Sequence, residues 1–197
     1  SMKLGKLVLN ITRCPTNDAN FAANVEHMFS SLLPASFLLR LSHSNLSQLR
    51  FGPRKDFQTN KLRSGVFQLA TGTQLIVDEN ALEQGAIKEN SLLNMQLLQA
   101  LINQSIVCYD FVYNRMELPC DLNVCILSDG RSVFKLGVDC TVPMVSHNTT
   151  SPSTTVTHLA NEQLELARMY ISLVNSMNAG HFSDGNNQEL NYVIDAR

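Results

Sequence analysis

A continuous apolar run that ends in two acids is the feature that most limits how this chain can fold. Residues Thr73 to Glu79 have the sequence TQLIVDE, and a second run of this kind, Leu122 to Ser128, has the sequence LNVCILS. Strands buried on both faces carry such uninterrupted runs, because helices cover both sides of a parallel sheet. The two runs therefore predict an α/β domain in which both segments are buried strands.

Segments with strand and helix patterns alternate around these runs. Lys6 to Thr12 alternates in polarity and is β-branched, which predicts a strand. Apolar residues from Phe21 to Leu32 recur at helical spacing, with Asp18 as a cap and Pro34 as a breaker. This order predicts a mixed or parallel sheet with helices on its faces. Further strands are expected at Ser36 to Leu41, Ser105 to Tyr113 and Val138 to Val145, and further helices at Asn45 to Leu49, Asn90 to Asn103 and Leu159 to Met177.

The composition changes after the last expected strand. Ser146 to Thr157 is rich in Ser, Thr, Asn and Pro and has no apolar face to bury, which is typical of a flexible linker. We therefore expect three parts: an α/β core over residues 1–145, a linker over 146–157, and a helical segment over 158–197.

Composition and charge exclude several classes of function. Charged residues make up 16 % of the chain, against roughly 25 % in typical soluble domains. The net charge of −2 provides no overall basic field for a phosphate backbone, so direct binding of nucleic acid is not expected. The five cysteines lack the paired spacing of a metal site or a disulfide framework, which favours a reducing compartment and no bound metal. No apolar stretch reaches the about 18 residues that span a membrane.

The acidic strand end has the form of a Walker B element. In such sites Asp78 would hold Mg²⁺ and Glu79 would polarise the attacking water, while Ser128 stands where a related ATPase places its sensor residue. The phosphate-binding pattern G-x-x-x-x-G-K-[ST] occurs nowhere in the chain. An acid at a strand end also accepts backbone N–H groups of the next segment, and we prefer this structural interpretation. We expect no catalytic residue, no cofactor and no nucleotide hydrolysis by this chain alone.

A basic stretch from Arg50 to Arg63 offers a candidate interaction surface. Aromatic side chains lie between its cations, and this arrangement is also typical of surfaces that bind a nucleic-acid backbone. Because the whole chain is acidic, we favour a solvated loop that contacts a protein partner. The candidate partner-binding residues are Arg54, Lys55, Lys61 and Arg63.

Several ordered motifs resemble those of one known family, the eukaryotic minichromosome maintenance complex-binding proteins. The most specific is the run KDFQTNKLRSG, from Lys55 to Gly65. The resemblance covers about residues 3–145 and includes, in order, Leu33 to Phe37, Asp78 to Gly85, Tyr109 to Phe111, Tyr113, Met116-Glu117, Pro119-Cys120, Asn123-Val124 and Ser128 to Ser132.

The resemblance implies an AAA-like fold in a nuclear, non-enzymatic protein that binds subunits of the MCM replicative helicase. The resemblance also implies that the protein acts as a chaperone and unloader, which promotes assembly of the helicase or its removal from chromatin. It further implies a role in DNA replication and sister-chromatid cohesion. Asp78, Glu79 and Ser128 would then be relics or structural residues, the phosphate-loop region would lie upstream of residue 1, and residues 158–197 would begin a lid. The alternative is an ATP-binding or hydrolysing half-domain that is completed by that upstream segment.

Overall fold

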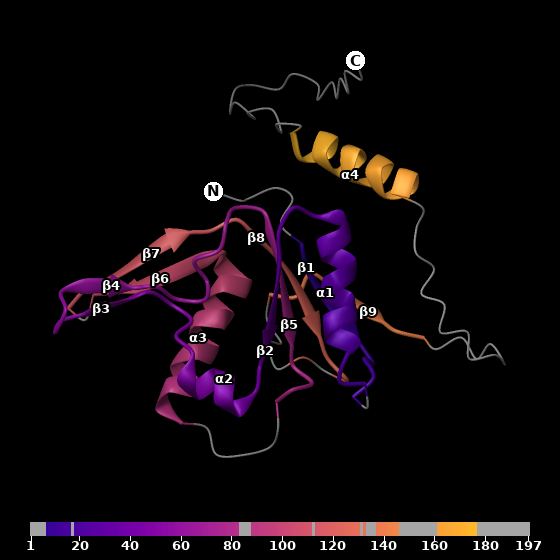
Figure 1. Ribbon diagram of the computed structural model, residues 1–197. Coiled ribbons are helices and arrows are strands. Elements are labelled where there is room, and N and C mark those ends of the chain that lie inside the picture. The colour runs from indigo at the N-terminus through magenta and orange to yellow at the C-terminus, as the bar shows by residue number, and fades with distance from the viewer. Residues whose placement is uncertain are drawn as a thin grey trace, which may run out of the picture.

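A five-stranded parallel sheet forms the centre of the protein (Figure 1). The structure is a computed structural model that describes residues 7–16, 18–82, 88–111, 113–130, 132, 137–145 and 161–176. The sheet has the order β2-β5-β8-β1-β9, and each neighbouring pair is parallel. The strands span β1 Val8–Thr12, β2 Ser36–Arg40, β5 Thr73–Asp78, β8 Leu122–Leu127 and β9 Cys140–Pro143. All five expected strands of this sheet are confirmed, with ends that differ by a few residues.

Helices cover both faces of this sheet and make a three-layer α/β domain. Successive side chains of a strand point to opposite faces, so Leu75 and Val77 pack in one apolar cluster while Ile76 packs in the other. The cluster around Ile76 is closed by α1, and the other cluster is closed by α2 and α3. These helices span α1 Phe21–Leu32, α2 His43–Gln48 and α3 Glu89–Gln104. Every residue of β5, and every residue of β8 except Asn123, is buried, for the reason expected from their apolar runs.

A second sheet extends from the side of the core that carries α3 (Figure 1). It has four strands in the order β4-β3-β6-β7, namely β3 Arg54–Asp56, β4 Lys61–Arg63, β6 Ile106–Asp110 and β7 Arg115–Pro119. The basic stretch is therefore an antiparallel hairpin of β3 and β4, and the expectation of a loop there is wrong. Strand β7 was not predicted, because its five residues are all exposed and give no alternation of burial.

One buried side chain joins α2, α3 and the start of the second sheet. The Asn94 amide donates from Nδ2 to the carbonyls of Leu46 at 2.9 Å and Leu49 at 2.8 Å. Its Oδ1 accepts the Phe51 N–H at 3.2 Å. A single residue of α3 therefore fixes the end of α2 and the turn of the chain toward β3.

Helix α4, Asn161–Ser176, is the last described element and confirms the expected C-terminal helix over that range. It touches α1 through Arg168, whose Nε donates to the Ser31 carbonyl at 2.7 Å. The expected linker, 146–157, and the last part of the expected helical segment, 177–197, lie outside the described residues. Among the described helices, none has the length and apolarity needed to cross a membrane.

Candidate functional site

The structure brings the three acidic and sensor-like positions to one edge of the central sheet. Because β1, β5 and β8 are parallel, their carboxyl ends meet there. The Glu79 N–H donates to Leu127 O at 3.0 Å, and the Ser128 N–H donates to Ile11 O at 3.0 Å. The backbone thus connects the ends of all three strands directly beside Asp78, Glu79 and Ser128.

Each of these side chains is buried and bound to a protein group. Asp78 Oδ1 accepts the Asn80 N–H at 3.1 Å, which confirms that a carboxylate at this strand end accepts a backbone N–H. Glu79 Oε1 accepts the Ser132 hydroxyl at 2.6 Å. Ser128 Oγ lies 3.0 Å from Asn10 Oδ1 and 3.1 Å from Gly130 O. In the described ranges, no group of three or more His, Cys, Asp or Glu side chains is arranged to hold a metal ion.

The loop that follows β1 stands where a phosphate loop would be. A phosphate loop joins a strand to a helix and offers free N–H groups at the helix N-terminus. At this edge, β1, residues 13–20 and α1 form that strand–loop–helix unit. That the phosphate-loop region of the whole protein lies upstream of residue 1 stays a prediction.

Several backbone N–H groups of this loop already donate to protein oxygens. The Arg13 N–H donates to Asp129 O and the Cys14 N–H donates to Ser128 O, both at 3.1 Å. The Cys14 side chain is 1 % exposed and packs against the sheet beside Ile76. At the start of α1, the Asp18 carboxylate accepts the Asn20 N–H at 2.9 Å. A carboxylate placed there repels an anion from the positive end of the helix.

Burial of Asp78 makes the stability of this edge depend on pH. Desolvation raises the pKa of the Asp78 carboxyl above its usual value, against the opposing effects of the Asn80 N–H and the Arg40 charge. The folded state then holds the proton more tightly than the unfolded state. The free energy of unfolding contributed by this group therefore falls as pH rises from the unfolded pKa, about 3.9, through the raised folded pKa.

The Asp78→Asn variant is expected to lose this pH dependence. An amide does not ionise, and its Oδ1 still accepts the Asn80 N–H. Urea unfolding at a series of pH values should show the variant gaining stability relative to the unaltered chain as pH rises through that window, with a constant difference above it. A difference that does not change with pH would contradict the assignment.

The register of the hairpin places Arg54, Lys61 and Arg63 on one face of the second sheet and Lys55 on the other. Arg54 and Lys55 are adjacent in β3, so their side chains point to opposite faces of the second sheet. Lys55 Nζ lies 5.3 Å from the centre of the Phe57 ring. Arg63 is paired with Asp56, and this hydrogen bond lowers the pKa of the Asp56 carboxyl. Lys61 is exposed on β4.

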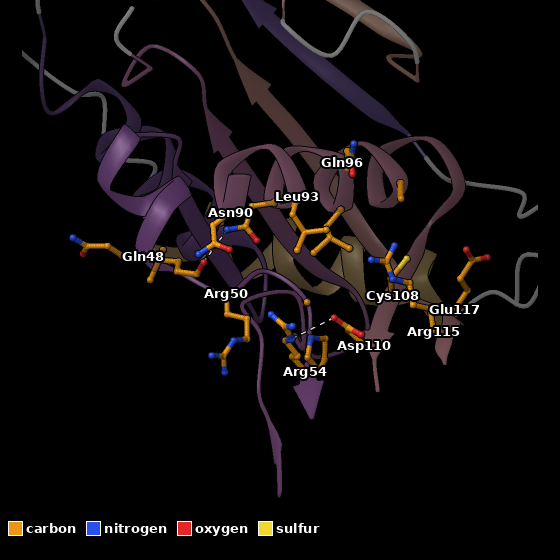
Figure 2. A pocket seen from close by; sticks show the side chains of 16 residues that line it. Gln48, Arg50, Arg54, Asn90, Leu93, Gln96, Cys108, Asp110, Arg115 and Glu117 are labelled. Carbon is orange, nitrogen blue, oxygen red and sulfur yellow. Dashed lines mark hydrogen bonds and ion pairs between the residues drawn. The ribbon is translucent and has the colours of Figure 1, made fainter. Parts of the chain in front are cut away.

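Arg54 instead lines a groove between α3 and the second sheet (Figure 2). Its cavity has a volume of about 270 Å³, and Arg54 Nε lies 3.4 Å from Asp110 Oδ2 inside it. The groove was not predicted, because its charged residues come from three separate segments and one of them is β7. The other groove residues used below are Arg50, Leu93, Leu97, Ala100, Arg115 and Glu117.

These features define a class of protein: a three-layer α/β domain with buried carboxylates at the end of a central parallel strand, in which the first two amides of the loop after β1 donate to backbone carbonyls. The family model described as mini-chromosome maintenance replisome factor matches residues 1–194, and the chain belongs to this family. It is similar to the mini-chromosome maintenance complex-binding proteins of Gallus gallus, with 41 % identity over 73 % of the chain and 22 % of the relative, and Homo sapiens, with 40 % identity over 72 % and 22 %. For the Danio rerio protein the identity is 36 % over 90 % of the chain and 28 % of the relative. The chain thus spans about a quarter of the length of these relatives.

Proposed function

We propose that this chain is a non-catalytic binding module of a replication factor that associates with the MCM replicative helicase. The name of the relatives, mini-chromosome maintenance complex-binding protein, supports the partner. The observation that supports a non-catalytic role is the occluded loop after β1, in which the Arg13 and Cys14 amides already donate to backbone carbonyls. These two amides are therefore not available to phosphates, which a nucleotide hydrolase cradles with the N–H groups of such a loop.

The finer parts of this proposal rest on the resemblance of the sequence motifs. They are that the whole protein is nuclear, acts as a chaperone that promotes assembly of the helicase or its unloading from chromatin, and supports DNA replication and sister-chromatid cohesion. Asp78, Glu79 and Ser128 have a structural role in this proposal. Residues 1–145 form the α/β core, 146–157 the linker and 158–197 the beginning of a helical lid.

An ATP-binding or hydrolysing half-domain, completed by an upstream segment, is the alternative. The strand-end carboxylates Asp78 and Glu79 favour it. The position of β1 and its loop counts against it, because a strand–loop–helix unit is already present at this edge and its Arg13 and Cys14 amides donate to backbone carbonyls.

Nucleic-acid binding through the basic hairpin has less support. A phosphate backbone is held by cations that are free to neutralise it. Here Arg54 is paired with Asp110 and Arg63 with Asp56, so part of the positive charge of β3 and β4 is already compensated.

The chain is expected to bind purified MCM subunits equally well with and without Mg·ATP. The experiment immobilises the chain on a sensor surface and measures the dissociation constant for each subunit in turn. Unrelated α/β domains of similar size serve as the control for non-specific adsorption. Failure to bind any subunit would contradict the proposed partner, and binding that requires Mg·ATP would favour the half-domain alternative.

A further inference from the structure

The groove between α3 and the second sheet has an apolar wall (Figure 2). Leu93, Leu97 and Ala100 follow one another at spacings of four and three residues, so they form one stripe along α3. All three side chains remain partly exposed. An apolar stripe that opens into a cavity can take up apolar side chains of another segment.

The opposite side of the groove is charged, with an excess of arginine. Arg50, Arg54 and Arg115 line it together with two carboxylates, Asp110 and Glu117. One guanidinium therefore exceeds the number of carboxylates, in a chain whose net charge is −2. Arg54 is paired with Asp110, whereas Arg50 and Arg115 are exposed at the groove, where each can bind a carboxylate through two parallel hydrogen bonds.

The groove is held in shape by its surroundings. A Cβ on Gly52 would lie 2.7 Å from the Cys108 carbonyl oxygen and 3.2 Å from Leu97 Cδ1. The backbone at Gly52 therefore lies so close to β6 and α3 that a side chain has no room there. The Asn94 amide fixes the adjoining end of α2. A preformed site loses less conformational entropy on binding.

We propose that this groove binds a peptide segment of an MCM subunit that carries a carboxylate next to apolar side chains. The carboxylate pairs with Arg50 or Arg115, and the apolar side chains pack on Leu93, Leu97 and Ala100. Asp110 and Glu117 leave the groove with an excess of only one positive charge, which suits a single carboxylate of a protein segment better than the repeated charges of a phosphate backbone. This inference rests on the proposed function, since it assigns the site for that partner.

The test compares groove variants with a charge-matched control in the MCM-subunit binding assay. Arg50→Glu and Arg115→Glu reverse a groove charge, Ala100→Phe fills the groove without changing its charge, and Lys88→Glu reverses an exposed charge just before α3 that does not line the groove. We expect each groove variant to weaken binding by about tenfold or more and Lys88→Glu to change it by less than about twofold. Raising the salt concentration should weaken binding by the unaltered chain and should affect Arg50→Glu less.

The outcomes separate this inference from the proposed function. Thermal melting first confirms that each variant is folded. If the unaltered chain and all groove variants bind equally well, the groove is not the binding site. The proposed partner would then still stand. If Lys88→Glu weakens binding as much as the groove variants do, the effect comes from the overall charge of the chain and not from the groove. Absence of binding by the unaltered chain would overturn both proposals.

Discussion

Replacing Asn94 by alanine is expected to lower the free energy of unfolding by about 3 kcal/mol. The substitution removes the partner of three backbone groups, the carbonyls of Leu46 and Leu49 and the N–H of Phe51. A buried backbone group left without a partner costs roughly 1–3 kcal/mol. The hydrogen bonds to Phe51 and Leu46 are buried, so water does not readily replace the lost amide there. The loss should appear as a lower urea midpoint.

The matched control for this prediction is Asn103→Ala in the same helix. Asn103 is exposed near the end of α3, where its Oδ1 accepts an exposed hydrogen bond from Gln99 Nε2 at 2.8 Å. Its replacement should change the free energy of unfolding by no more than about 0.5 kcal/mol. Equal effects of the two substitutions would show that Asn94 does not connect α2, α3 and Phe51 in solution.

The Gly65→Ala substitution is expected to destabilise the fold by at least about 2 kcal/mol. A Cβ at this position would lie 2.5 Å from both the Gly52 carbonyl carbon and the Phe51 carbonyl oxygen. These neighbours are backbone atoms, so one chain segment must move, and overpacking of this kind costs roughly 1–3 kcal/mol or more. Movement is opposed by the Val66 and Phe67 N–H groups, which donate to Arg50 O at 2.9 Å and Phe51 O at 3.0 Å.

Gly130→Ala provides the comparison for this glycine. A Cβ on Gly130 would meet no atom within 4 Å, so alanine there should leave the thermal midpoint nearly unchanged. We expect Gly65→Ala to lower the midpoint by several degrees in the same melting experiment. Equal midpoints for the two variants would mean that the segments around Gly52 and Gly65 do not approach as closely as described.

Much of the central sheet could be predicted from the sequence, because burial leaves a pattern there. The run before Asp78 is apolar since β5 is covered on both faces, and the stripe through Leu98 and Leu101 follows the core side of α3. The second sheet could hardly be predicted from the sequence. Strand β4 is exposed at every residue, and β3 and β4 have three residues each, which is too short to show an alternation of apolar and polar positions.

Only one feature of the candidate site could be predicted from the sequence: the position of its residues at the ends of neighbouring parallel strands. Asp78, Glu79 and Ser128 follow two buried strands, so their meeting at one edge follows from the sheet. The hydrogen-bond partners of these residues could not be predicted in this way. Ser132, which donates to Glu79, lies 53 residues further along the chain. The groove likewise depends on register, since the pairing of Asp110 with Arg115 places two of its charges side by side on β6 and β7.

The central claim is that the carboxylate edge has a structural role and that the chain acts by binding. Calorimetric titration of the chain with Mg·ATP tests it most directly, because it requires no partner protein. The account predicts no saturable heat of binding up to millimolar nucleotide, with the same result for the Glu79→Gln variant. A micromolar dissociation constant for Mg·ATP would contradict it.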